Sequence, residues 1–261
     1  MFRAWINFMI ASMIFFPTRE FSARPEDFGL RAEEVWCQTQ DKIKLHGWFF
    51  QAEQKEASLC LLLFHGNADN ISSRLPKAQA WLKRGISVLL IDYRGYGKSD
   101  GKIEKGSDLY EDACTALNWL TKEKAYSSER IILYGESIGS VPAVELASQQ
   151  AFKAVILEAP FTSLKEIAKH HYGLVPDFMI QDFLLNNESK MPRLKSPVFI
   201  LHGNEDEVVP FEMGKRLFDK APHPKDFLEV KKAHHNDISI VGGADFFEAP
   251  YQFVLNSQPS S

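Results

Sequence analysis

Six short apolar runs, each leading into a loop, restrict the fold of this sequence more than any other feature. They are LCLLLF (59–64), SVLLID (87–92), RIILY (130–134), AVILEA (154–159), VFIL (198–201) and FLEV (227–230). Most segments between them have helical periodicity, and a strand that is apolar on both faces needs helices on both sides of its sheet. The sequence therefore predicts an α/β fold in three layers around a mostly parallel sheet.

Residues 33–50 predict a β-hairpin at one edge of that sheet. The segment QTQDKIKLHGWFF (38–50) is typical of a turn and second arm, with Asp41 at the turn. An antiparallel pair added to the apolar runs gives about eight strands in all. A long helix is expected over residues 106–123, where Ser107 has the residue type of an N-cap.

Composition limits the size of the fold and its partners. A chain of 261 residues, 45% of them hydrophobic, can bury one sizeable core and is expected to form one main domain. Its net charge of -4 supplies no basic face for nucleic acid. Cys37, Cys60 and Cys114 are widely spaced, which argues against a disulfide framework and indicates a reducing compartment.

The N-terminus carries an unusual apolar segment, AWINFMIASMIFF (4–16). As a helix it would be about 20 Å long, too short for a hydrocarbon core of about 30 Å. We favour anchoring at a membrane surface through residues 4–16. A helix packed in a groove of the domain and a cleaved signal peptide are the alternatives, although Phe21 fits a cleavage site poorly.

The segment YGESIGS (134–140) predicts a nucleophilic serine. It follows an apolar run and opens a helical segment, so Ser137 would lie on a sharp strand-to-helix turn with its hydroxyl exposed. Gly135 and Gly139 supply the small residues that such a turn needs, because strand and helix come close together there. The alternative is a small residue at an ordinary turn.

A serine needs a base and an acid that orients the base. Asp206 and His235 follow the last two apolar runs, in the chain order Ser, Asp, His that this architecture uses. The alternative for Asp206 is a solvated carboxylate between two glutamates. His234 competes with His235 as the base, because either can reach Ser137 from a flexible loop.

The backbone N–H groups of Asn67 and Ile138 are the predicted oxyanion donors, because they lie in the loop after the first apolar run and directly after the nucleophile. His65 and His202 each open an HGN loop, where we expect their rings to bond to backbone groups. The remaining four histidines are expected to be structural.

The sequence supports neither a cofactor nor a metal site. RGYGKS (94–99) imitates a phosphate-binding loop, but Asp92 stands where that loop needs a glycine. Arg94 is instead expected to hold its loop by ion pairing. No His, Cys and Asp spacing resembles a zinc site, and a serine triad needs no metal.

Taken together, these motifs resemble the α/β-hydrolase superfamily over residues 28–255. DYRGYGKSDG (92–101), APFTS (159–163) and FFPTREF (15–21) are similar to its small-cap branch, which includes monoacylglycerol-lipase-like enzymes and protein depalmitoylases. The resemblance implies a short cap at about 164–194, after the sixth strand, an N-terminal approach at 1–27, and a polar tail at 256–261 that we expect to be disordered. It aligns His235 as catalytic and puts His234 where a glycine is usual. The cysteine cluster of the depalmitoylases is missing.

We therefore predict a serine hydrolase that cleaves carboxylic esters of medium or long acyl chains. Its partner would be a small-molecule or lipid-like acyl ester, and its location membrane-associated or cytoplasmic. A thioesterase acting on acylated proteins is the first alternative. An amidase or peptidase is a weaker one, and a dehalogenase would need a carboxylate at 137. From another class, the fold also permits a non-catalytic binding module.

Overall fold

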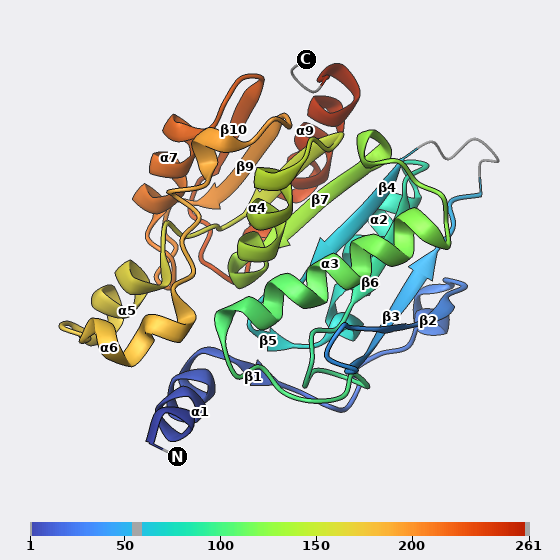
Figure 1. The fold of residues 1–261 in the computed structure, drawn as a ribbon. Helices are drawn as coiled ribbons and strands as arrows, with labels where there is room; N and C mark the ends of the chain where they lie inside the picture. Colours follow the sequence, from blue (N-terminus) through green and yellow to red (C-terminus); the bar gives the residue numbers. More distant parts are fainter. Residues whose placement is uncertain (1, 54–58, 259–261) are drawn as a thin grey trace.

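The computed structural model describes residues 2–53 and 59–258 and centres on an eight-stranded sheet, in the order β10-β9-β8-β7-β4-β6-β3-β2 (Figure 1). Its strands are β2 (Glu33–Gln38), β3 (Lys44–Phe50), β4 (Cys60–Phe64), β6 (Ser87–Ile91), β7 (Ile131–Glu136), β8 (Ala154–Glu158), β9 (Val198–Gly203) and β10 (Lys225–Val230). β3 pairs antiparallel with β2 and β6, and all the other pairs are parallel. The predicted mostly parallel sheet with an antiparallel hairpin at one edge is confirmed.

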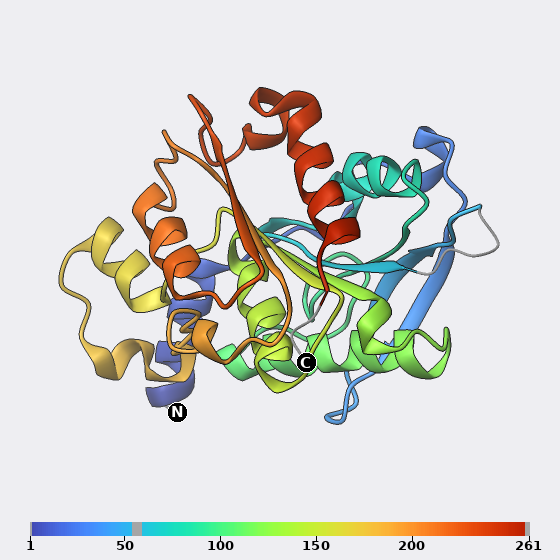
Figure 2. The same cartoon turned by 90° about the horizontal axis from the view of Figure 1, so that it is seen from above.

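Helices cover both faces of the sheet (Figure 2). On one face lie α3 (Gly106–Lys122), α4 (Ser140–Gln149) and α7 (Phe211–Lys220); on the other lie α2 (Leu75–Leu82) and α9 (Gly243–Asn256). Within β4, Leu62 and Phe64 join the first core and Leu61 and Leu63 the second, and all four are fully buried. The run is continuously apolar because both faces of the strand are covered.

Shorter elements complete the connections. The remaining α-helices are α1 (Phe2–Ile14), α5 (Leu164–Tyr172), α6 (Asp177–Ile180) and α8 (Ile238–Val241). The 3₁₀ helices are η1 (Pro25–Phe28), η2 (Ile71–Arg74), η3 (Ser128–Arg130), η4 (Ser137–Gly139), η5 (Gln181–Phe183) and η6 (Met191–Arg193). A small parallel pair joins β1 (Phe16–Pro17) to β5 (Ala68–Asp69).

The N-terminal helix α1 packs beside α5 and α6 on the carboxyl side of the sheet (Figures 1 and 2). Ile6 and Ile10 are buried against the domain. Asp182 accepts hydrogen bonds from Arg3 Nε at 2.6 Å and Asn7 Nδ2 at 2.9 Å, which ties the helix to η5. α1 thus occupies a groove of the domain. No helix in the described part of the chain has the length and apolar character required to span a bilayer.

The structure differs from two expectations. Helix α3 begins at Gly106, so Ser107 lies inside it; the carboxylate of Asp108 accepts the N–H groups of Glu104 (2.8 Å) and Lys105 (3.1 Å) instead. A carboxylate serves this helix start better because it also complements the positive end of the helix dipole.

The first residues of the tail at 256–261, which we expected to be disordered, are ordered in the structure. Asn256 closes α9, and Ser257 is buried, with its carbonyl accepting from Lys153 Nζ at 2.7 Å. The rest of the predicted tail, residues 259–261, lies outside the described residues.

The loop after β6 is held as the sequence predicts. Arg94 is buried and pairs with Asp112 at 2.8 Å and with Asp41 at 2.7 Å, so one guanidinium joins the hairpin turn, the β6 loop and α3. A buried guanidinium needs such partners, because an unpaired charge in the interior is costly.

Candidate active site

Ser137 lies on a strained turn between β7 and α4. Its φ of 52° falls in the left-handed region, which residues other than glycine seldom adopt. A Cβ at Gly139 would lie 2.1 Å from the carbonyl oxygen of Phe64, and one at Gly135 would lie 2.5 Å from that of Gly139. Neither glycine can carry a side chain, so both are fixed by the close approach of helix and strand.

The structure brings the three predicted triad residues together. His235 Nε2 lies 3.2 Å from Ser137 Oγ, and His235 Nδ1 lies 2.7 Å from Asp206 Oδ2. The three side chains follow β7, β9 and β10, parallel strands whose carboxyl ends lie on the same side of the sheet, with β8 between β7 and β9. This hydrogen-bonded chain has the geometry of a nucleophile, a base and an orienting acid.

Asp206 is held as an ionised acceptor. Its Oδ1 accepts the backbone N–H groups of Val208 at 2.9 Å and Val209 at 2.7 Å. Burial opposes ionisation, but hydrogen bonds from His202 and His235 outweigh it and hold the pKa of the Asp206 carboxyl well below its usual range. The carboxylate therefore stays charged at neutral pH and orients the imidazole.

The environment of His235 favours the charged ring. Burial lowers its pKa, while the hydrogen bond and charge of Asp206 raise it, and the net result is a pKa above the ordinary value. The Asp206 carboxylate would therefore stabilise the imidazolium that His235 becomes on accepting a proton.

His234 points elsewhere. Its side chain is half exposed, and its Nδ1 lies 3.0 Å from Glu207 Oε2. Its backbone N–H donates to Asp237 Oδ1 at 2.7 Å. Of the two adjacent histidines, the structure places His235 against the serine.

The two HGN-loop histidines bond to backbone carbonyls as expected. His65 Nδ1 lies 2.7 Å from the oxygen of Gly66, and His202 Nε2 lies 2.9 Å from that of Val209. His202 Nε2 also lies 3.3 Å from Asp206 Oδ2. Sequence reasoning missed this second contact, because nothing in the HGN pattern shows where the ring points.

Asn67 lies in the loop between β4 and β5 and is held from several directions. Its Nδ2 donates to the carbonyl of Ile14 at 3.0 Å, and its own carbonyl accepts from Phe16 N at 2.9 Å and Tyr96 Oη at 2.8 Å. Among the residues that the structure describes, no acceptor takes its backbone N–H. This agrees with the donor role predicted for Asn67, and Ile138 lines the same cavity as Ser137 and Asn67.

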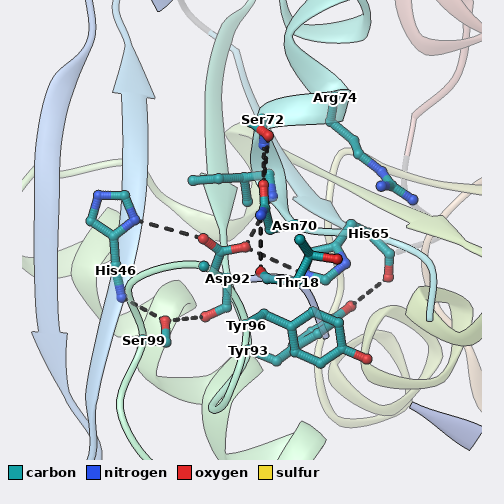
Figure 3. Close-up of polar contacts among 12 residues, drawn as sticks. Thr18, His46, His65, Asn70, Ser72, Arg74, Asp92, Tyr93, Tyr96 and Ser99 are labelled. Atoms are coloured by element: carbon teal, nitrogen blue, oxygen red, sulfur yellow. Dashed lines mark hydrogen bonds and ion pairs between the residues drawn. The ribbon is translucent and has the colours of Figure 1, made fainter. Parts of the chain in front are cut away.

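A buried cluster around Asp92 includes His65, the residue directly after β4 (Figure 3). His46 Nδ1 and His65 Nε2 each lie 3.7 Å from a carboxylate oxygen of Asp92, which also accepts from Ile71 N at 2.9 Å. Burial lowers the pKa of His65 to about 3, so its ring is neutral. The cluster joins β3, the end of β4 and the end of β6.

An apolar cavity of about 620 Å³ opens beside Ser137. The segment 164–194 and α1 supply most of its wall, and Ser137 and Asn67 lie in it. The apolar lining residues are Ile10, Met13, Ile14, Phe16, Ile138, Phe161, Leu164, Ile167, Ala168, Leu174, Val175, Pro176, Met179, Ile180, Val208 and Val209. His171, which we expected to be only structural, lies in this wall.

A second cavity, of about 420 Å³, is polar and has Ser137 and His235 in its wall. Its floor holds the charged residues Arg74, Lys77, Glu136 and Glu158. Sequence reasoning missed these residues: only Glu136, directly before the serine, lies in a motif that it singled out. Within residues 2–53 and 59–258, no group of three or more His, Cys, Asp or Glu side chains is placed to hold a metal.

This fold, with a serine, histidine and aspartate at the carboxyl ends of its strands, defines an α/β hydrolase. Residues 54–186 match the family described as "Serine aminopeptidase, S33". The chain is 36% identical over 243 residues to alpha/beta hydrolase domain-containing protein 17B of Homo sapiens, covering 90% of this chain and 78% of that protein. It is 33% identical over 249 residues to protein bem46 of Schizosaccharomyces pombe, covering 92% and 82%.

The chain therefore belongs to the α/β-hydrolase family and is a hydrolase. Among solved structures, the Pyrococcus furiosus esterase Pf2001 superimposes with a TM-score of 0.77 at 20% identity, covering 92% of this chain and 98% of that one. This likeness supports the fold.

The link between Asp206 and His235 predicts a change in titration. In Asp206→Asn the burial of the ring remains and the charge that raises its pKa is gone, so the midpoint of His235 moves to lower pH. Proton NMR of the imidazole measures it. Glu207→Gln, which touches His234 instead, is the control. An unmoved midpoint in Asp206→Asn contradicts the assignment.

Proposed function

We propose that this hydrolase cleaves carboxylic esters of medium or long acyl chains through an acyl-enzyme on Ser137. One observation carries the proposal: the hydrogen-bonded chain from Asp206 through His235 to Ser137 ends at an apolar cavity. A hydroxyl activated by a base and placed beside an apolar cavity suits attack on an acyl carbonyl.

The reaction would proceed in two steps. His235 takes the proton of Ser137 as Oγ attacks the carbonyl carbon, and the backbone N–H groups of Asn67 and Ile138 stabilise the oxyanion. The tetrahedral species then expels the alcohol, to which His235 returns the proton. Water, activated by the same histidine, hydrolyses the acyl-enzyme and restores the serine.

The apolar cavity supports an acyl chain better than an amino acid. An aminopeptidase must hold the free amino group of the residue that it acylates onto serine, which calls for a carboxylate on the acyl side. The described wall of the apolar cavity contains none. A thioester would meet the same triad and the same cavity, so an acylated thiol stays the first alternative substrate.

We also propose that the mouth of the apolar cavity meets a membrane surface. Met13, Phe16 and Leu174 line the cavity and are also exposed, Leu174 by 93%. Trp5 and Phe8 are further exposed apolar side chains of α1. Several large exposed apolar side chains on a folded chain mark a binding site, and here Met13, Phe16 and Leu174 adjoin the cavity that would receive a lipid-like acyl chain.

Ile10→Trp tests the acyl cavity. Ile10 is buried and lines the cavity from α1, so an indole there fills space that a long chain needs. We expect kcat/KM for para-nitrophenyl octanoate to fall about tenfold or more, and that for the acetate ester to change much less. Ser12→Trp puts the same bulk on the exposed side of the helix and is the control. Equal loss on both esters, or wild-type preference for acetate, contradicts the proposal.

Co-sedimentation with phosphatidylcholine vesicles tests the membrane surface. The double variant Trp5→Ser, Phe8→Ser removes two exposed aromatic rings and should bind at least about tenfold more weakly than wild type. Trp36→Ser, an exposed tryptophan on edge strand β2, should bind as wild type does. Wild-type protein that stays in the supernatant overturns this part of the proposal.

A further inference from the structure

The polar cavity lies where the leaving group of an ester must go. Both cavities have Ser137 and Asn67 in their walls, but His235 lines the polar one. When the first tetrahedral species collapses in the acylation step, His235 gives its proton to the leaving-group oxygen or sulfur, so that atom must lie next to His235. With the acyl chain in the apolar cavity, the leaving group extends into the polar cavity.

The floor of the polar cavity is an internally compensated set of charges. Lys77 Nζ lies 2.7 Å from Glu136 Oε2 and 2.5 Å from Glu158 Oε2. Arg74 Nη2 lies 2.6 Å from Glu136 Oε1. Tyr134 Oη donates to Glu158 at 2.6 Å from below. These charges are mostly buried and pair with each other. The floor therefore carries little net charge of its own but presents fixed hydrogen-bonding groups to the cavity.

Asp69 adds a third carboxylate to this cavity, close enough for its charge to raise the pKa of Arg74 although the two side chains form no ion pair. It lies in the wall of the same cavity, is exposed, and within the described residues its carboxylate has no ion-pair or hydrogen-bond partner. The cavity wall therefore carries three carboxylates (Asp69, Glu136 and Glu158) against two cations (Arg74 and Lys77). One excess negative charge remains beside the path of the leaving group.

We propose that the polar cavity is a leaving-group subsite that takes a cationic alcohol or thiol, with Asp69 as its charge-selecting residue. The inference rests on the proposed ester hydrolysis and names the other half of its substrate. In the acylation step the acyl carbon forms its bond to Ser137 Oγ and its bond to the leaving oxygen or sulfur breaks. The serine proton passes through His235 to that departing atom, which leaves as a cationic alcohol or thiol.

A matched pair of substrates tests the subsite. Octanoylcholine and 3,3-dimethylbutyl octanoate have the same acyl chain and nearly the same shape, and differ in one positive charge. We expect wild type to prefer the choline ester by about tenfold in kcat/KM at low salt, with the preference shrinking as salt screens the charge.

Asp69→Asn is the informative variant. Asp69 has a φ of 66°, a backbone conformation that asparagine also tolerates, so the substitution removes the charge and keeps the turn. The preference for the choline ester should fall to nearly one in this variant. Glu129→Gln, in η3 at the opposite end of β7, should keep the wild-type preference.

The outcomes separate the two proposals. If wild type hydrolyses both octanoyl esters at equal rates, or if Asp69→Asn keeps the full preference, the charge-selecting subsite is wrong and ester hydrolysis stands. If folded wild type hydrolyses neither ester nor para-nitrophenyl octanoate, the proposed function itself fails.

Discussion

The candidate active site depends on how closely the start of α4 approaches the end of β4. There is no room for a Cβ at position 135 or 139. Because both residues are glycines, the chain can turn sharply there and hold Ser137 in the left-handed region. That turn lifts the serine hydroxyl beyond the sheet edge. The same approach sets Ile138 beside the loop that carries Asn67. One steric constraint thus positions the proposed nucleophile and both predicted oxyanion donors, and the backbone strain at Ser137 is maintained by the packing around it.

The N-terminal segment forms part of the wall of this site. α1 supplies part of the apolar wall, and the carbonyl of Ile14 accepts from the Asn67 side chain. The chain that follows pairs through Phe16 with the Asn67 loop. Movement of α1 would therefore alter both the apolar cavity and the Asn67 loop, which carries a proposed oxyanion donor. Around Ser137 the cavity on the side of α1 is apolar and the cavity on the side of His235 is polar, which would give the proposed ester substrate a preferred direction of binding.

Local patterns were sufficient to predict the strands and the residues at their ends. Continuous apolar runs mark buried parallel strands, and the order of the loops after them placed Ser137, Asp206 and His235 at one edge. What the sequence could not show were contacts between distant segments. Lys77 meets Glu158 and His202 meets Asp206 only through the packing of the folded chain. The cap predicted at Ser107 was wrong because Ser107 lies inside the helix, and the carboxylate of Asp108 instead accepts the N–H groups of Glu104 and Lys105, which precede it.

The most direct test of an activated serine at position 137 is the intact mass of the protein after exposure to an alkyl fluorophosphonate, measured beside Ser137→Ala. The account predicts a single phosphonyl adduct on wild type, in which phosphorus bonds to Ser137 Oγ and fluoride leaves, and no adduct on the variant. An unmodified, folded wild-type protein would contradict it, as would an adduct that persists in Ser137→Ala.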